Sequence, residues 1–268
     1  MDRSKISGMA TPEAPSATDA TTAPFSATAW ARQAAGWAFT TAFIPGIVVA
    51  CTVLGPKRRT VGGPRLVRMW GHTMARIAGI EVQFTARAQQ VLAQRLPRVL
   101  TFNHSSTLDV LTGAALLPEG GVLVVKEEMR KIPLLGIGCA SLGSVFLERG
   151  NREHAYESLK HAAARMHAEQ LQLLIAPEGT RATDGKLGRF KLGAFHLAAL
   201  AQVPIQPMVL HNHFELWPHG QFVPKPGVAI IDALEPLWIA ADEDPRAVAE
   251  GLRERYAMAL ANGPQHGT

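Results

Sequence analysis

Short apolar runs alternate with longer helical patterns from about residue 80 to the C-terminus. The runs are four to six residues long and rich in Val, Ile, Leu and Phe, which is typical of buried strands. Strands that alternate with helices predict an α/β fold, a mixed and largely parallel sheet flanked by helices. We expect strands at 81–85, 98–102, 122–126, 144–147, 171–176, 205–210 and 228–232, and helices at 107–117, 152–169, 190–201 and 245–262.

The longest apolar stretch precedes this region, at residues 29–55, and contains about enough residues to cross a membrane. Pro45-Gly46 interrupts it, so a kinked or re-entrant helix pair fits the pattern as well as a straight span does. Trp30 and Trp37 suit the interfacial layer of a bilayer. The stretch therefore predicts an N-terminal membrane-associating helical motif.

A further helix is predicted at 64–78, with Pro64 in its first turn. A helix with one apolar stripe and one basic stripe can lie in a headgroup layer. The alternative is an ordinary surface helix packed on the core. The apolar stripe consists of Leu66, Val67, Trp70, Met74 and Ile77, and the basic stripe of Arg65, Arg68, His72 and Arg76.

Composition excludes several classes of protein. The chain has 268 residues, of which 47% are hydrophobic, so it can bury a core without staples and is not disordered as a whole. Cys51 and Cys139 are too few for a disulfide framework. We expect a disordered tail at 1–28, membrane-anchoring helices at 29–79, a globular domain at 80–262 and a disordered C-terminus at 263–268.

The formal net charge of +5 is concentrated near the apolar stretch. No acidic residue occurs between Asp19 and Glu81, and that interval holds Arg32, Lys57, Arg58, Arg59, Arg65, Arg68 and Arg76. Basic clusters beside apolar sequence favour an anionic membrane surface over nucleic acid. The cluster after the apolar run favours keeping this side cytoplasmic. A lipoprotein cleavage site before Cys51 is the weaker alternative.

The first group of chemically active residues follows the strand at 98–102. His104 and Asp109 are five positions apart, which would place them about 140° apart on one helix. They can meet only if His104 lies in a turn and Asp109 in the first helical turn, where the carboxylate would orient the imidazole as a base. Ser106 to Asp109 also fits a capping box, and a Ser105–His104 nucleophile pair is a further alternative.

Two further segments carry arginines after predicted strands. Arg149 follows 144–147, and Pro177-Glu178-Gly179-Thr180-Arg181 follows 171–176. Glycine lets the backbone approach a ligand closely, and arginine offers a planar fork to phosphate oxygens. Each arginine alone could be a surface ion-pair residue; the order of the three segments is what makes the pattern specific.

In these segments the chain resembles the glycerolipid acyltransferases, in particular the 1-acyl-sn-glycerol-3-phosphate acyltransferases of the PlsC type. The resemblance covers residues 65–236 and rests on four blocks. These are Asn103-His104-Ser-Ser-Thr-Leu-Asp109, Gly143-Ser-Val-Phe-Leu-Glu-Arg149, Pro177-Glu178-Gly179-Thr180-Arg181 and Val203-Pro-Ile-Gln-Pro207. Lys126 matches the family's lysine between the first two blocks.

The resemblance implies an activity and roles for the blocks. His104 would be the general base and Asp109 its orienting group, for transfer of an acyl group from acyl-CoA or acyl carrier protein to the sn-2 hydroxyl of lysophosphatidic acid. The acceptor phosphate would bind Lys126, Arg149, Glu178, Gly179, Thr180 and Arg181. No cofactor or metal is implied, and the expected location is the cytoplasmic face of the inner membrane, as a monotopic or single-span protein.

Alternatives remain at this point. The acceptor could be another lyso-lipid, such as a lyso-ornithine lipid or a lysophospholipid in remodelling. The chain could instead be a catalytically silent lipid-binding protein, or a hydrolase that uses Ser105. His211 and His213 have the spacing of two metal ligands, although no third ligand with convincing spacing accompanies them.

Overall fold

A computed structural model describes residues 26–148, 152–240 and 242–264. Residues 1–25 of the predicted tail at 1–28 lie outside the described residues, as do residues 265–268 of the predicted C-terminal tail. Helix α1 (Ala27–Ile77) begins two residues inside the predicted tail, capped by the Ser26 side chain, which accepts a hydrogen bond from Ala29 N.

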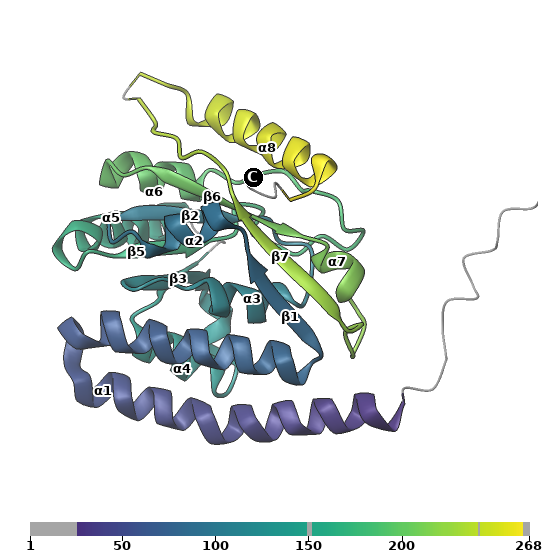
Figure 1. The fold of residues 1–268 in the computed structure, drawn as a ribbon. Coiled ribbons are helices and arrows are strands. Elements are labelled where there is room, and N and C mark those ends of the chain that lie inside the picture. Colours follow the sequence, from purple (N-terminus) through teal and green to yellow (C-terminus); the bar gives the residue numbers. More distant parts are fainter. Residues whose placement is uncertain (1–25, 149–151, 241, 265–268) are drawn as a thin grey trace, which may run out of the picture.

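Helix α1 is a hairpin of two arms (Figure 1). We call 27–54 the first arm and 56–77 the second arm. The break is at Gly55, with φ 70° and ψ 174°, rather than at the expected Pro45-Gly46, where the helix continues. Pro56 disfavours helical geometry at the preceding residue, and glycine adopts positive φ at little cost. Within the described residues, the stretch 27–53 is the one helical segment long and apolar enough to cross a membrane.

The second arm packs on the globular domain. Gly71 lies so close to α3 (Asp109–Leu116) that an added Cβ would be 2.6 Å from Ala115 N and from Leu111 O. Trp70 and Met74 contact a buried cluster that contains Ala75 and Leu108. The apolar stripe of the predicted amphipathic helix is thus a packing face, which is what the surface-helix alternative predicts.

The sheet has seven strands in the order β1-β7-β6-β2-β5-β3-β4. Every neighbouring pair is parallel except β6 and β7, so the predicted mixed, largely parallel sheet is confirmed. The strands are β1 (Ile80–Phe84), β2 (Arg98–Phe102), β3 (Gly121–Lys126), β4 (Val145–Leu147), β5 (Gln172–Ile175), β6 (Ile205–His211) and β7 (Gly227–Ala233).

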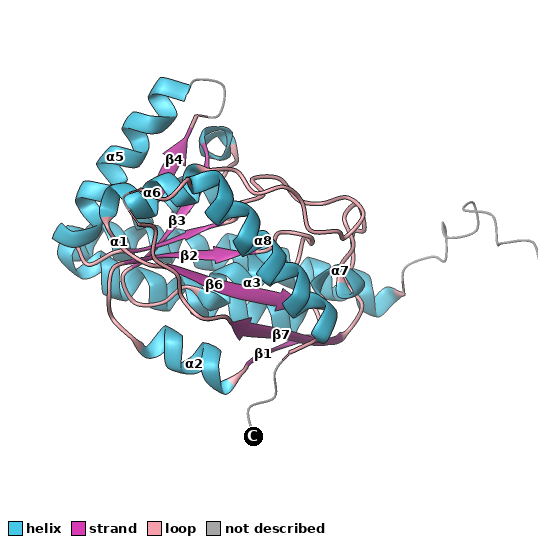
Figure 2. Ribbon diagram, turned by 90° about the horizontal axis from the view of Figure 1, so that it is seen from above, coloured by secondary structure: helices cyan, strands magenta, loops and turns pink. Residues whose placement is uncertain are grey.

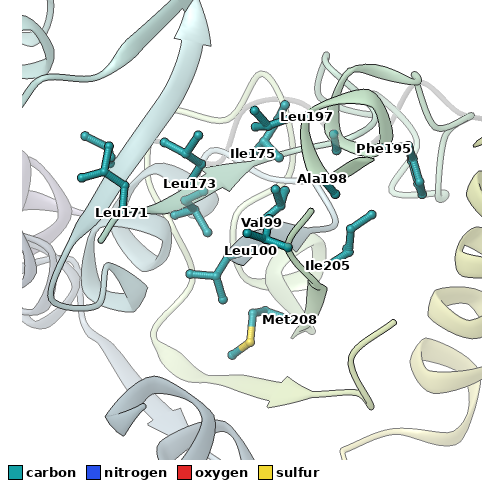
Figure 3. Close-up of a cluster of buried hydrophobic side chains, with 14 of the residues drawn as sticks. Val99, Leu100, Leu171, Leu173, Ile175, Phe195, Leu197, Ala198, Ile205 and Met208 are labelled. Atoms are coloured by element: carbon teal, nitrogen blue, oxygen red, sulfur yellow. The ribbon is translucent and has the colours of Figure 1, made fainter. Parts of the chain in front are cut away.

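Helices cover both faces of the sheet. The hairpin of α1 lies with α3 and α4 (Leu135–Leu142) on one face, and α6 (Gly193–Ala201) and α8 (Pro245–Asn262) cover the other (Figures 1 and 2). Figure 3 shows apolar side chains of β2, β5 and β6 packed beneath α6. This core fixes the central strands, whose ends carry the candidate site. The other helices are α2 (Ala86–Ala93), η1 (Glu127–Lys131), α5 (Arg152–Ala168) and α7 (His213–Leu216).

All seven predicted strands and all four predicted helices of this domain are present, and 98–102 and 245–262 have the predicted bounds. The sequence patterns missed α2, η1, α4 and α7. These elements are short or, in α4, interrupted by Gly136 and Gly138, so their apolar periodicity is weak.

Candidate active site

The candidate site lies where the parallel strands end. Strands β2 to β6 all run in one direction, so their carboxyl ends meet at one edge, which we call the carboxyl edge. His104 follows β2, Lys126 ends β3 and Glu178 follows β5. Ligand sites of open α/β sheets form at such an edge.

His104 and Asp109 meet as the sequence predicts. His104 Nδ1 is 2.8 Å from Asp109 Oδ2, and the Asp109 side chain has no exposed surface, whereas the His104 side chain is 22% exposed. An ionised carboxylate only accepts hydrogen bonds, so Nδ1 carries the proton and Nε2 presents a lone pair. The imidazole is thus arranged as a base with one nitrogen available.

The hydrogen bonds of the predicted capping box are present in part. Asp109 Oδ2 also accepts a hydrogen bond from Ser106 N at 2.8 Å, and Ser106 Oγ accepts one from Leu108 N at 3.0 Å. Helix α3 itself begins at Asp109, with Leu108 as its N-cap and no side-chain cap, so Ser106 is not the N-cap that the capping-box alternative predicts. The carboxylate that closes the turn is nevertheless the one that contacts His104.

Asn103 and Ser106 attach the turn to the domain. Asn103 Nδ2 donates to Leu210 O at 3.0 Å, and Leu210 N donates to Asn103 Oδ1 at 2.8 Å. Ser106 Oγ donates to Trp217 O at 2.6 Å. The side-chain amide of Asn103 thus makes the same pair of hydrogen bonds to β6 that a backbone residue of a neighbouring strand would make. The sequence patterns include Asn103 in the first of the four blocks but assign it no role. Its position directly after a predicted strand is the feature that could have indicated this one.

Glu178 lies beneath this turn and is buried. His104 N donates to Glu178 Oε1 at 2.6 Å, and Gly188 N donates to Oε2 at 2.7 Å. Burial raises the pKa of the Glu178 carboxyl, and the two backbone N–H donors oppose that shift. Both carboxylate oxygens of Glu178 therefore accept backbone hydrogen bonds, and the carboxylate holds in place the segment that carries His104.

Two more hydrogen bonds join the third block to the first. Arg181 Nη1 donates to Thr107 Oγ1 at 3.1 Å, and Ala182 N donates to His104 O at 3.0 Å. Gly179 has φ 72°, a conformation that favours glycine. The turn at Gly179 places Thr180 and Arg181 at the surface, where both are exposed.

The predicted phosphate ligands are partly brought together. Arg181 lies beside the turn that holds His104, and Lys126 is half-buried at the same edge, with β5 between β3 and β2. Arg149 lies outside the described residues. The side chains of Lys57, Arg58 and Arg59, part of the predicted basic cluster, also lie outside them.

The alternatives based on Ser105 and on a metal gain no structural support. Ser105 is buried, and the hydrogen bonds of the described residues include none between its hydroxyl and His104. His213 is buried, with Nδ1 2.8 Å from His211 O and Nε2 3.0 Å from Thr112 Oγ1. No group of three or more His, Cys, Asp or Glu side chains in this part of the chain is arranged to hold a metal ion.

Comparison with known proteins agrees with the geometry. The sequence matches the family model described as Acyltransferase over residues 83–211. It is 30% identical over 219 residues to the 1-acyl-sn-glycerol-3-phosphate acyltransferase alpha of Ovis aries, covering 82% of this chain and 72% of that protein. It is 30% identical over 191 residues to the 1-acyl-sn-glycerol-3-phosphate acyltransferase of Saccharomyces cerevisiae, covering 70% and 61%.

Other relatives are matched over a smaller share of their length. The chain spans 50% of a putative 1-acyl-sn-glycerol-3-phosphate acyltransferase of Caenorhabditis elegans, at 33% identity over 142 residues. The fold is similar to the crystal structure of the 1-acyl-sn-glycerophosphate (LPA) acyltransferase PlsC from Thermotoga maritima. That similarity has a TM-score of 0.70 at 22% identity and covers 88% of this chain and 98% of that one.

These findings confirm the resemblance drawn from the four sequence blocks. The matched region contains His104, Asp109 and Glu178, the residues that the structure joins at the carboxyl edge. The chain belongs to the 1-acyl-sn-glycerol-3-phosphate acyltransferase family.

Proposed function

We propose that the protein transfers a fatty acyl group to the sn-2 hydroxyl of lysophosphatidic acid and so forms phosphatidic acid. The observation that carries the proposal is the partly exposed imidazole of His104, held through Nδ1 by a fully buried Asp109. Family membership and the arginine-bearing loop on the same turn support it.

In the proposed reaction His104 Nε2 takes the proton of the acceptor hydroxyl as that oxygen attacks the thioester carbon of the acyl donor. The new C–O bond forms, the C–S bond breaks, and the proton passes from the imidazolium to the leaving thiolate. Asp109 stabilises the imidazolium, as a buried carboxylate on the other ring nitrogen does in related catalytic pairs. No acyl-enzyme forms, and no cofactor is needed besides the donor, acyl-CoA or acyl carrier protein.

We assign two different tasks to the third block. Arg181, with the neighbouring Thr180 and Gly179, would bind the acceptor phosphate through charge-assisted hydrogen bonds, and Lys126 and Arg149 would add charge from β3 and from the segment after β4. Glu178 is assigned a positioning role, because its two oxygens already accept backbone N–H groups and an anion repels phosphate.

We further propose that α1 holds the enzyme at an anionic phospholipid membrane, on the cytoplasmic face. The first arm is apolar and mostly exposed, with Trp30 60% and Trp37 68% exposed. Its hairpin form, with the break at Gly55, favours monotopic insertion over a single span.

The test is an acceptor and donor panel on detergent-solubilised protein, with thiol release as the common readout. We expect lysophosphatidic acid to be the best acceptor, with release strictly dependent on it. A stronger response to a lyso-ornithine lipid or to a lysophospholipid with a larger headgroup would overturn the acceptor assignment. Absence of thiol release with every pair would indicate a silent lipid-binding protein, and an acceptor-independent burst would indicate a Ser105 hydrolase.

A further inference from the structure

The segment between η1 and α4 exposes apolar side chains on the described surface. We call residues 131–134 the tip. Three consecutive residues, Lys131, Ile132 and Pro133, are exposed. The side chain of Ile132 is 44% exposed, and that of Ile137, in the first turns of α4, is 57% exposed. Two large aliphatic side chains are thus presented to the surroundings within six residues.

The tip is held in a rare backbone geometry. Leu134 has φ 63° and ψ −52°, and Leu135 N donates to Pro133 O at 2.7 Å. This is a γ-turn of the uncommon, strained kind. Strained residues persist only where the surroundings fix them, and they concentrate at functional segments. The turn reverses the chain sharply between Ile132 and Ile137.

The tip also lies next to the hairpin of α1. Helix α4 packs against both arms (Figure 1): an added Cβ at Gly63 would lie 2.7 Å from Leu142 Cδ1, and one at Gly138 would lie 3.8 Å from Ile44 Cγ2. Ile137 is therefore adjacent in sequence to the residue that contacts the apolar first arm. At its other end, η1 begins directly after Lys126 on the carboxyl edge.

We propose that the tip and Ile137 form a second membrane contact, which enters the interfacial layer of an anionic bilayer beside α1. The tip and Ile137 adjoin the first arm through Gly138, which lies near Ile44, and a lipid surface is the partner that both can share. Within η1, Glu127 pairs with Arg130 at 2.6 Å and Glu128 is exposed. Lys131 is the exposed base next to Ile132 and is suited to an anionic headgroup. Contact through α1 and the tip together would place the carboxyl edge at the headgroup layer.

The proposal concerns membrane contact and does not depend on which lyso-lipid is acylated. Cys51 and Cys139 are buried, so a cysteine introduced at the surface can be labelled selectively. We would label Ile132→Cys of the full chain with an environment-sensitive fluorophore and add vesicles of equal parts phosphatidylethanolamine and phosphatidylglycerol. Met258→Cys on α8 is the matched control, since Met258 is 57% exposed on the opposite face.

We expect the emission of the label at position 132 to rise several-fold and shift to shorter wavelength with vesicles, and that of the control to stay constant. A response that appears with purified acyl carrier protein or at high protein concentration, but not with vesicles, would assign the patch to another protein or to a second copy. That result, or no response at all, overturns the proposal.

A second measurement does not depend on a label. The pair Ile132→Ser and Ile137→Ser should weaken vesicle partitioning about tenfold, because two aliphatic side chains lose burial. The matched pair Leu200→Ser and Met258→Ser, 37% and 57% exposed in the wild type, should partition like the parent. Equal partitioning of the two pairs, with unchanged circular dichroism, contradicts the membrane role.

Discussion

The carboxyl edge of the sheet and the first arm of α1 use side chains in opposite ways. At the edge, the buried carboxylates make specific hydrogen bonds, as Glu178 does with His104 N and Gly188 N. In the first arm, Trp37, Val49 and Val53 are 62–79% exposed. The carboxyl edge depends on individual hydrogen bonds, so the loss of one atom can abolish an interaction. The first arm depends on its total apolar area, so each substitution there changes membrane affinity by a part.

This difference predicts that variants at the edge change turnover and leave membrane affinity alone, and that variants in the arm do the reverse. The largest effect is expected for His104→Ala and Asp109→Asn, which should lower kcat about 10²–10⁴-fold because the base or its orienting group is lost. Lysophosphatidate acylation in detergent measures the loss. Retained activity in both variants would refute the mechanism, and a parallel loss of vesicle binding would break the comparison.

Arg181→Ala should raise the acceptor KM about 10–100-fold, since a hydrogen bond to a charged group contributes about 1.5–3 kcal/mol. The variant should keep its KM for the acyl donor, which does not carry the acceptor phosphate. Steady-state kinetics with each substrate varied in turn measures both constants. An unchanged acceptor KM would remove the phosphate role of Arg181.

Glu178→Gln should lower kcat about 10-fold and leave the acceptor KM nearly unchanged, because the amide can keep only one of the two N–H acceptors. The ratio of the two effects separates a positioning role from phosphate binding. A variant with unchanged kcat and raised KM would assign Glu178 to the substrate. Because burial raises the pKa of this carboxyl, kcat of the wild type should fall as pH drops through that pKa.

The pair Trp37→Ser and Val53→Ser should weaken binding to anionic vesicles about tenfold through lost apolar burial. In detergent the same variant should turn over like the wild type, since both side chains are mostly exposed. Vesicle sedimentation and the detergent assay, run on one preparation, make the comparison. A fall in kcat without a change in partitioning would show that the arm supports the site directly.

A last prediction compares the stability of the two arms of α1 through a glycine-to-alanine substitution in each. Gly71→Ala should destabilise the protein by about 1–3 kcal/mol, because the new methyl group meets backbone atoms of α3 at 2.6 Å. Gly46→Ala meets nothing within 4 Å and should stabilise the helix by about 0.5–1 kcal/mol. Denaturant unfolding in detergent measures both, and equal shifts would mean that the arms are packed alike.

Much of this arrangement could be read from the sequence where local pattern and structure coincide. Strand β2 and helix α8 have predicted bounds because apolar runs and the Asp244-Pro245 start are local signals. For His104 and Asp109, the turn geometry gives a condition under which they can meet, and the resemblance carried by the four blocks implies that they do. The domain boundaries at 28, 79 and 262 stay predictions.

The remainder depends on contacts that no local pattern encodes. One of the two partners of Glu178 is a backbone N–H 74 positions away, so the sequence block indicates a phosphate ligand and not a positioning role. The break in α1 lies at Gly55, before Pro56, while Pro45 and Pro64 remain within continuous helix, so the position of a proline does not by itself locate the break. Helix α4 is stabilised by packing against α1, although its own sequence is rich in glycine.

The hydrogen bonds between residues 104–107 and 178–182 make two loops behave as one body. A ligand that orders one loop therefore orders the other. If Arg181 binds phosphate as proposed, anchoring a part of the acceptor that does not react also reduces the motional freedom of the imidazole. Binding energy from the phosphate would then lower the activation barrier as well as hold the acceptor. Specificity for a phosphate headgroup would therefore affect kcat as well as KM.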